Sequence, residues 1–327
     1  MNLQIAFLTV LLTMLTIASA DEHNPLESST SRIYEVAITN DLQYLSPDRE
    51  QKCDLYQPAN ASPGETFPGI VIIHGGGWTK GDKAARREQE IGNTLAANGY
   101  VCISINYLLH TDKPNPWPQN LHDCKNAVRF LRKYADKYHV DANHIGAIGG
   151  SAGGHLTSML AVTGPEKRFE PNEPYPGYSS RIQAAVDMYG ISDLATWQET
   201  DPNGHPTGVR KLSPGERLLG VSLDENPQLW QAASPIYNIT PDDPPILILH
   251  GLADTTVDYE QSIVFARKLS HRGVENTLHL IPNVGHTFAL RTDVRGRPLP
   301  EDLTPIVLDF FNKYLKPATD SQRQPSQ

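Results

Sequence analysis

Six short apolar segments of the chain are predicted to be buried β-strands. Val, Ile and Leu dominate them, and apolar and polar positions do not alternate strictly along them. This pattern is typical of strands that are covered on both faces of a sheet. The six segments are residues 69–75, 100–107, 144–150, 184–190, 245–251 and 276–282.

Apolar residues recur at helical spacing between most of these strands. The predicted helices are residues 120–138, 152–162, 258–272 and 302–315. The third of them is expected to begin with a capping pair, Asp258 and Gln261, and to end before Gly273. The alternation of strands and helices predicts the α/β class, with a mostly parallel, doubly wound sheet and helices on both of its faces.

Two segments interrupt this alternation. Residues 163–182 are rich in Pro and Gly and are expected to form a surface loop. Residues 194–235 contain two short helical patterns and are expected to form a small insertion near the carboxyl edge of the sheet. The polar ends, residues 21–32 and 316–327, flank a single predicted domain that covers residues 33–315.

The first twenty residues have the pattern of a secretory signal peptide. They carry no charged side chain, residues 5–18 are apolar, and Ala18-Ser19-Ala20 is a small-residue cleavage pattern. Cleavage after Ala20 predicts a secreted or periplasmic protein with no stable membrane insertion. Because no Lys or Arg precedes the apolar run, an uncleaved membrane anchor is the alternative interpretation.

Composition narrows the function classes. Of the 327 residues, 39% are hydrophobic and 20% are charged, which is ordinary for a soluble globular protein. The net charge of −9 argues against binding to nucleic acid or anionic membrane surfaces, because both need a positive patch. Cys53, Cys102 and Cys124 are expected to be small buried hydrophobes, with one disulfide as the alternative. No Cys/His spacing indicates a zinc site, and no sequence feature indicates an oligomeric state.

One serine among glycines carries the candidate chemistry. Gly149-Gly150-Ser151-Ala152-Gly153 matches the pattern G-x-S-x-G, and it lies between a predicted strand and a predicted helix. At such a turn the hydroxyl is exposed, and the residues two before and two after the serine must be small. The helix N-terminus adds positive partial charge beside the hydroxyl. A chance glycine turn is the alternative, which the strand and helix on either side disfavour.

A serine nucleophile needs a base and an acid that orients the base. The expected chain order is Ser, acid, His. Asp254 and His286 each follow a predicted strand, so both are predicted to lie at the same sheet edge as Ser151. Asp193 and Asp258 are rival acids, but the first precedes the expected position and the second resembles a helix cap.

The tetrahedral intermediate of acyl transfer needs N–H donors for its oxyanion. The glycine-rich segment 74–82 follows a predicted strand and lets backbone N–H groups approach a substrate closely. Gly75 and Gly76 are the expected donors there, together with Ala152 after the serine. A phosphate-binding loop is disfavoured because G-x-x-x-x-G-K-[ST] is absent. Two histidines outside these motifs, His155 and His250, are expected to be structural.

These motifs occur in the order found in the α/β-hydrolase superfamily. The resemblance runs from about residue 50 to 315 and is carried by the segments IVIIHGGGWTKGDK, ISINYLL, NLHDCKNAVRFLR, HIGAIGGSAGGHL, ASPIYNI, ILILHGLADTTV and GHTF. The chain most resembles secreted carboxylesterases grouped with feruloyl and acetylxylan esterases. It is also similar to the hormone-sensitive-lipase-like esterases, which share the glycine-rich loop.

The resemblance implies the α/β-hydrolase fold, with a small insertion between nucleophile and acid, and a serine esterase activity. By position it implies Ser151 as nucleophile, Asp254 and His286 as its partners, and an oxyanion hole of Gly75, Gly76 and Ala152. It implies short-chain or polysaccharide-linked acyl esters, acetyl or feruloyl, as substrates, and the chemistry requires no metal or cofactor.

Three aromatic residues near these motifs, Trp78, Tyr107 and Phe288, are weaker candidates for contact with the substrate. For Trp78, simple packing in the core is an equal alternative. Two other interpretations of the whole chain stay open: a serine peptidase of the same fold, and a non-catalytic binding protein. The second would be expected to lack a member of the Ser-His-Asp set, and this chain lacks none.

Overall fold

The computed structural model describes residues 32–164, 169–293 and 295–316. These residues belong to one compact unit. The predicted signal peptide lies outside the described residues, as do the predicted N-terminal segment except Arg32 and the predicted C-terminal tail except Lys316. Within the described ranges, no helix has both the length and the apolar character needed to cross a membrane.

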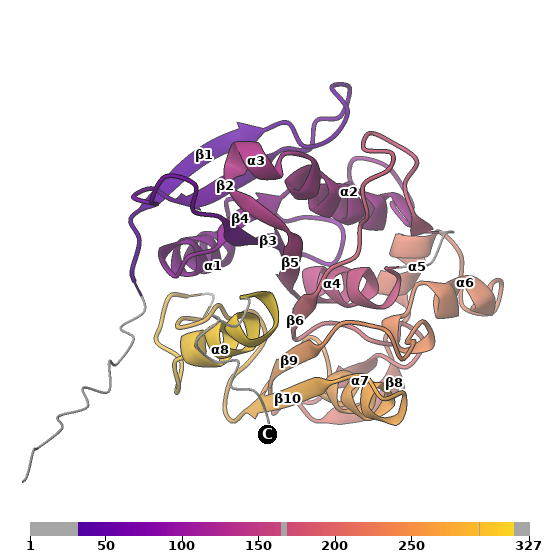
Figure 1. Cartoon of the computed structure of the whole chain (residues 1–327). Coiled ribbons are helices and arrows are strands. Elements are labelled where there is room, and N and C mark those ends of the chain that lie inside the picture. Colours follow the sequence, from indigo (N-terminus) through magenta and orange to yellow (C-terminus); the bar gives the residue numbers. More distant parts are fainter. Residues whose placement is uncertain (1–31, 165–168, 294, 317–327) are drawn as a thin grey trace, which may run out of the picture. The chain divides into compact units, whose positions relative to one another are not determined.

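An eight-stranded sheet forms the centre of the fold (Figure 1). In spatial order its strands are β1 (Val36–Leu42), β2 (Cys53–Pro58), β4 (Val101–Ile105), β3 (Phe67–Ile73), β5 (Val140–Gly150), β6 (Ala184–Met188), β9 (Ile246–Gly251) and β10 (Asn276–Ile281). The pairs from β4 to β10 are parallel, whereas β1 with β2 and β2 with β4 are antiparallel. The predicted, mostly parallel sheet is therefore confirmed, and β1 and β2 are additions to it.

Helices cover both faces of the sheet, as predicted. One face packs on α1 (Arg86–Ala97) and α8 (Thr304–Leu315), and the other on α2 (Gln119–Lys133), α4 (Ala152–Val162) and α7 (Glu260–His271). The strands serve both faces because their side chains alternate. In β3, for example, Ile70 and Ile72 belong to the apolar core on the side of α1 and α8, and Val71 and Ile73 belong to the core on the other side.

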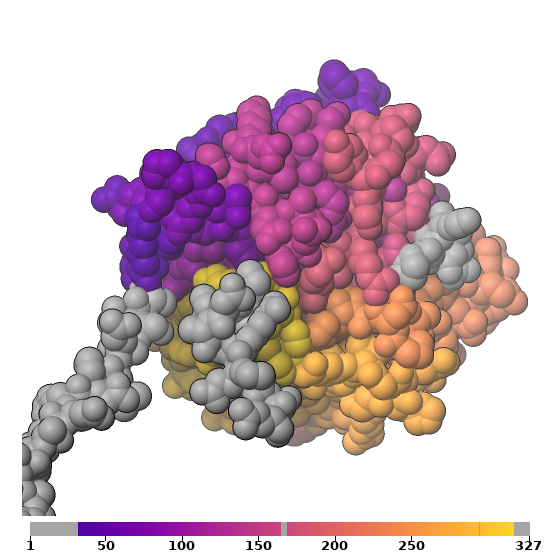
Figure 2. All heavy atoms as spheres, viewed as in Figure 1, coloured from indigo at the N-terminus to yellow at the C-terminus, as the bar shows by residue number. Residues whose placement is uncertain are grey.

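The last helix lies against β5 and β6 and reaches the connection between α1 and β4. The Tyr100 hydroxyl donates to Asn312 Oδ1 of α8 at 2.7 Å, and the Lys316 ammonium donates to the carbonyl of Asn98 at 3.0 Å. In Figure 2 the yellow atoms of α8 accordingly lie beside the purple atoms of the N-terminal part. These contacts join the C-terminal end of the described chain to the connection between α1 and β4.

The insertion between β6 and β9 contains more structure than predicted. Its two expected short helices are present as α5 (Ser213–Leu219) and α6 (Pro227–Ala232), followed by the 3₁₀ turn η2 (Pro235–Tyr237). Ahead of them, β7 (Gln198–Thr200) and β8 (Pro206–Arg210) form a two-stranded antiparallel hairpin. The hairpin was not expected, because its strands lack an apolar alternation.

Two local predictions were wrong. The segment 120–138 forms two helices, since α2 ends at Lys133 and α3 (Ala135–Tyr138) follows it. Helix α7 begins at Glu260 without a side-chain cap. Asp258 instead accepts the backbone N–H of Gln198 at 2.8 Å, and the side-chain carbonyl of Gln261 accepts the N–H of Asp193 at 2.8 Å.

The segment 163–182 has no regular helix or strand among its described residues, apart from a single turn at Phe169, but it is not simply a surface loop. Phe169, Tyr175 and Ile182 are buried in the core. Basic side chains of α2 hold the segment, since the Arg132 guanidinium donates to the carbonyl of Arg181 at 3.0 Å. Buried apolar contacts and charged donors together fix this connection.

Candidate active site

Ser151 lies at the turn between β5 and α4, in a backbone conformation that L-residues rarely adopt. Its φ is +58° and its ψ is −123°. A Cβ on Gly149 would overlap the carbonyl oxygen of Gly153, and a Cβ on Gly153 would overlap that of Ile73. Both glycines are therefore required for the sharp turn that exposes the serine hydroxyl. The first turn of α4 begins directly behind it.

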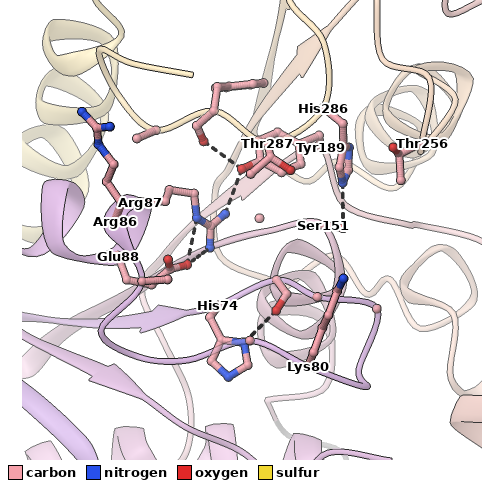
Figure 3. A pocket seen from close by; sticks show the side chains of 18 of the residues that line it. His74, Lys80, Arg86, Arg87, Glu88, Ser151, Tyr189, Thr256, His286 and Thr287 are labelled. Carbon is pink, nitrogen blue, oxygen red and sulfur yellow. Dashed lines mark hydrogen bonds and ion pairs between the residues drawn. The ribbon is translucent and has the colours of Figure 1, made fainter. Parts of the chain in front are cut away.

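The structure brings Asp254 and His286 together with Ser151. His286 Nε2 lies 2.9 Å from Ser151 Oγ, and His286 Nδ1 lies 2.6 Å from Asp254 Oδ2. In the tautomer that satisfies both contacts, the Nδ1–H group donates to the carboxylate and Nε2 accepts the serine hydroxyl. Asp254 is fully buried and the imidazole is 13% exposed, so only the histidine and serine face the cavity (Figure 3).

The carboxylate of Asp254 is held in its charged form. Its Oδ1 accepts the backbone N–H groups of Thr256 at 2.7 Å and Val257 at 3.0 Å. Burial opposes the charge, but hydrogen bonds from His250 and His286 outweigh burial and hold the pKa of this carboxyl well below its usual range. A permanently ionised Asp254 keeps the Nδ1 proton on His286 and leaves Nε2 free to act as a base.

His250 is a further member of this network. Its Nε2 lies 3.3 Å from Asp254 Oδ2 and 3.1 Å from the carbonyl of Val257, while its Nδ1 lies 2.7 Å from Ser262 Oγ. The residue is fully buried. It is structural, as the sequence predicted, but it also touches the candidate acid. The spacing of four residues from His250 to Asp254, across the end of β9, was the signal that could have indicated this contact.

The rival acids lie elsewhere. Asp193 accepts the hydroxyl of Tyr237 at 3.0 Å, and Asp258 binds the backbone of Gln198. Neither contacts His286. The contact of Asp254 with His286 Nδ1 therefore singles out Asp254 as the candidate acid.

The glycine-rich loop after β3 lies against the serine. A Cβ on Gly75 would be 2.8 Å from the carbonyl oxygen of Gly150 and 3.3 Å from Ser151 Cβ. Gly76 has a φ of +117°, which only glycine adopts readily. Within the described part of the chain, the N–H groups of Gly75, Gly76 and Ala152 have no hydrogen-bond acceptor. They are therefore available to a substrate oxygen.

Polar contacts fix the far end of this loop. The N–H of Lys83 donates to Asn106 Oδ1 at 2.6 Å, and Asn106 Nδ2 donates to Asp82 Oδ2 at 3.0 Å. The Lys83 ammonium forms an ion pair with the buried carboxylate of Asp54 at 2.7 Å. The loop is thus anchored at its end as well as at β3.

A cavity of about 630 Å³ opens above Ser151 and His286. Phe288 is among the residues that line it, although its side chain is only 1% exposed, and its contact with substrate stays a prediction. Trp78 and Tyr107 do not line it: Trp78 is fully buried and packs edge-on against His155, and the Tyr107 hydroxyl donates to the carbonyl of His74 at 3.0 Å. For these two aromatic residues the structure supports core packing rather than substrate contact.

Several other lining residues were not predicted. They include His74, Lys80, Arg87, Tyr189, Trp197 and Arg217 (Figure 3 labels the first four). Arg87 comes from α1, a helix that the sequence analysis did not find, and no motif surrounds it. Among the described residues, no three or more His, Cys, Asp or Glu side chains are grouped so that they could hold a metal ion. The three cysteines are buried free thiols.

A model of the BD-FAE family matches residues 53–269, which is more than half of the chain. The chain belongs to this family. The match includes β5, Ser151, the insertion and Asp254, and it ends within α7. The BD-FAE assignment agrees with the superfamily resemblance seen in the motifs.

The curated relatives of this BD-FAE chain at 30% identity or more are named as esterases or carboxylic ester hydrolases, whereas one at 24% identity, YuxL of Bacillus subtilis, is named as an uncharacterized peptidase. The chain is 31% identical over 267 residues to the probable carboxylic ester hydrolase LipM of Mycobacterium tuberculosis, a match covering 81% of this chain and 60% of LipM. The chain spans about three fifths of the length of the curated relatives that it matches most strongly.

Two solved structures share the fold. A truncated carbohydrate esterase from gut microbiota has a TM-score of 0.71 and 27% identity, covering 87% of this chain and 98% of its own. Esterase 2 of Thermogutta terrifontis, with propionate bound, has a TM-score of 0.66 and 27% identity, covering 89% and 98%. Together with the mostly parallel sheet, these likenesses show the α/β-hydrolase fold.

Proposed function

We propose that this protein is a serine esterase that hydrolyses carboxylic esters through an acyl-enzyme. One observation carries the proposal: Ser151, His286 and Asp254 form a continuous hydrogen-bonded chain, with links of 2.9 and 2.6 Å, at the floor of a cavity. A hydroxyl, an imidazole and a buried carboxylate in this order are what nucleophilic acyl transfer needs.

The geometry supports the following first half-reaction. His286 Nε2 takes the proton of Ser151 Oγ as the oxygen attacks the ester carbonyl carbon. The carbonyl oxygen becomes negative and faces the free N–H groups of Gly75, Gly76 and Ala152, which stabilise the charge. The intermediate collapses when His286 returns the proton to the departing alcohol, leaving the acyl group on the serine.

The second half-reaction repeats these roles with water. His286 removes a proton from the water as it attacks the acyl-enzyme, and the same N–H groups hold the second oxyanion. Proton return to Ser151 Oγ releases the carboxylic acid. Throughout, the ionised Asp254 stabilises the imidazolium and keeps the ring in one orientation.

We propose short-chain or polysaccharide-linked acyl esters, acetyl or feruloyl, as substrates. Support comes from the gut-microbiota relative, whose name states that it is a carbohydrate esterase, and from the propionate bound to the Thermogutta terrifontis esterase.

The test is hydrolysis by the purified chain of p-nitrophenyl acetate, butyrate and octanoate, methyl ferulate and acetylated xylan. Ser151→Ala should abolish turnover, and Ser270→Ala, an exposed serine on α7, should not. Retained activity in Ser151→Ala would refute the proposed nucleophile. Turnover of p-nitroanilides in preference to every ester would favour the peptidase interpretation instead.

We also propose that the chain is exported, with cleavage after Ala20. The support is the apolar run and the small-residue pattern that precede Asp21. N-terminal sequencing of the protein recovered from a secreting host should begin at Asp21. A retained Met1 in membrane fractions would favour the anchor.

A further inference from the structure

We propose that Arg87 and Tyr189 form a brace that holds the glycine-rich loop, Ser151 and His286 at their working separations. The two residues, here called the Arg87–Tyr189 brace, are positioning residues. The inference rests on the proposed esterase function and adds a structural cause for the alignment of its parts.

Arg87 links two of the segments that carry the chemistry. Its Nη2 donates to the carbonyl of Ile73 at 3.1 Å, at the end of β3 and directly before the glycine-rich loop. Its Nη1 donates to the hydroxyl of Tyr189 at 3.0 Å, and its Nε donates to Glu88 Oε1 at 2.8 Å. In Figure 3 the guanidinium accordingly lies between Glu88 and Tyr189 on the wall of the cavity.

Tyr189 links Arg87 to the histidine loop. Its hydroxyl donates to the carbonyl of Phe288 at 2.8 Å, two residues beyond His286. Its ring meets the imidazole of His286 edge-on, with 4.9 Å between the ring centroids, and the ring of Phe288 at 4.5 Å. The backbone of Tyr189 has a φ of +44°, which is rare for a bulky residue, and its N–H donates to the carbonyl of Leu249 at 2.7 Å.

The brace also touches the turn that carries the serine. A Cβ on Gly150 would overlap Arg87 Nη1 and would lie 2.7 Å from the Tyr189 hydroxyl. The middle residue before the serine of a G-x-S-x-G turn is not itself required to be glycine. Here glycine is required because the brace fills the space of a side chain. The requirement for glycine at position 150 therefore supports the brace on steric grounds, in addition to the hydrogen bonds.

The buried ion pair of Arg87 with Glu88 indicates that the brace fixes the geometry of the site rather than adding to the stability of the fold. The side chains of Arg87 and Glu88 are only 9% and 3% exposed. A buried ion pair gains little over apolar side chains of the same volume, because both charges lose their hydration. Such a pair is explained if its hydrogen bonds fix a geometry. The pair stands where three active-site segments converge, and acyl transfer is sensitive to shifts of about 1 Å.

The sharpest test is Tyr189→Phe, which removes one oxygen and keeps both ring contacts. We expect kcat to fall about tenfold with KM nearly unchanged, because the histidine loop loses its anchor. Turnover is expressed per active site titrated with a fluorophosphonate, so that unfolded protein does not count. Tyr237→Phe is the matched control, since its hydroxyl also donates to a buried acceptor, Asp193, but does not line the cavity.

The second part of the test is a double-mutant cycle. Arg87→Met should lower kcat about a hundredfold, and adding Tyr189→Phe should lower it no further, because the two residues act as one unit. Arg87→Lys keeps the charge beside Glu88 but cannot reach Ile73 and Tyr189 together, so it should remain at least tenfold impaired.

Three results would overturn the brace: kcat per titrated site in Tyr189→Phe equal to that of the parent, effects that multiply independently in the cycle, or full activity in Arg87→Lys. If Arg87→Met does not fold, Tyr189→Phe and Arg87→Lys decide alone. Failure of the esterase proposal looks different, because the parent itself would then neither hydrolyse esters nor react with the phosphonate.

Discussion

The two sides of Ser151 are built in different ways. On the side of β9 and β10, the His286 side chain contacts the serine and the Asp254 side chain contacts His286, and each residue lies in the loop that follows its strand. On the side of β3, the candidate donors are backbone N–H groups of Gly75 and Gly76. Their positions depend on β3 and on Lys83 at the end of the loop, which is held by Asn106 and Asp54 from other parts of the chain.

This difference indicates which parts of an active site can be predicted from a sequence. Reactive side chains stand in short motifs, because chemistry requires particular residue types at strand ends. The groups that hold a backbone in place need only reach it, so they can come from anywhere in the chain.

Replacing Asp254 by Asn should have the largest effect after loss of the serine itself. The backbone N–H groups of Thr256 and Val257 would hold the amide oxygen, so the NH2 group would face His286 Nδ1 and favour the wrong tautomer. We expect kcat for p-nitrophenyl butyrate to fall by about 10³ to 10⁴. The control is Asp193→Asn, which should retain activity close to the parent's. A larger loss in the control would move the acid to Asp193.

Gly76→Ala should disturb the candidate N–H donors on the side of β3. The added Cβ would overlap the carbonyl oxygen of Lys80, so the loop must shift and take its N–H donors with it. We expect kcat to fall by about 10² to 10³, the loss typical of a missing oxyanion donor. Gly77→Ala is the matched control, because a Cβ there meets nothing within 4 Å although its φ is +62°. Equal losses in both variants would argue against a specific role for Gly76.

His250→Gln should have an intermediate effect on the acid–base side. It weakens a contact to the ionised Asp254, and a hydrogen bond to a charged group contributes about 1.5–3 kcal/mol, so we expect kcat to fall about tenfold. His155→Gln is the control, since His155 is equally buried and binds the carbonyl of Ala233 at 2.7 Å without touching Asp254. Both variants should unfold more easily, but only His250→Gln should lose kcat per titrated site.

Asp187, on β6 between the two sides, should affect stability more than turnover. Burial raises the pKa of its carboxyl to about 6, and hydrogen bonds from Ser158 and Gly190 only partly oppose this. The folded state then binds the proton more tightly than the unfolded state. The contribution of Asp187 to the free energy of unfolding is therefore fully present below about pH 4. Up to about 3 kcal/mol of this contribution is lost as pH rises through 6.

Urea unfolding at pH 4.5 and 7.5 checks this expectation. Asp187→Asn should remove that part of the decrease in the free energy of unfolding between the two pH values. An identical pH dependence in parent and variant would show that Asp187 has an ordinary pKa. Asp254 is also buried, but hydrogen bonds from two histidines lower its pKa. Comparing the two carboxyls therefore shows how far histidine donors stabilise the charged form of a buried carboxylate.

Six central strands and most helices were predictable because long apolar runs and helical spacing survive in a buried sheet. Strand β1 and helix α1 are two of the elements that left no such pattern. Strand β1 is an edge strand with five of its seven residues exposed, so it shows no apolar face. Helix α1 begins with Arg-Arg-Glu-Gln-Glu, and only a few buried side chains such as Ile91 and Leu95 mark its inner side.

The candidate site was predictable to the same extent. Ser151, Asp254 and His286 carry their own signals at strand ends, whereas Arg87 and Tyr189 are 102 residues apart and lie outside every motif. Trp78 is the reverse case, a residue that the sequence suggested for the site and that the structure places in the core. It stands beside the glycine-rich loop in sequence, but its φ of +58° turns the indole into the core, and nothing in the local sequence indicates that turn.

The most direct test of the account is covalent labelling of the purified chain with a fluorophosphonate, followed by intact mass and peptide mapping. We predict one equivalent of label, located on Ser151, with loss of esterase activity in proportion to labelling. Hydrolysis of esters by a chain that takes no label, or a label on any other residue, would contradict the assignment of Ser151 as the nucleophile.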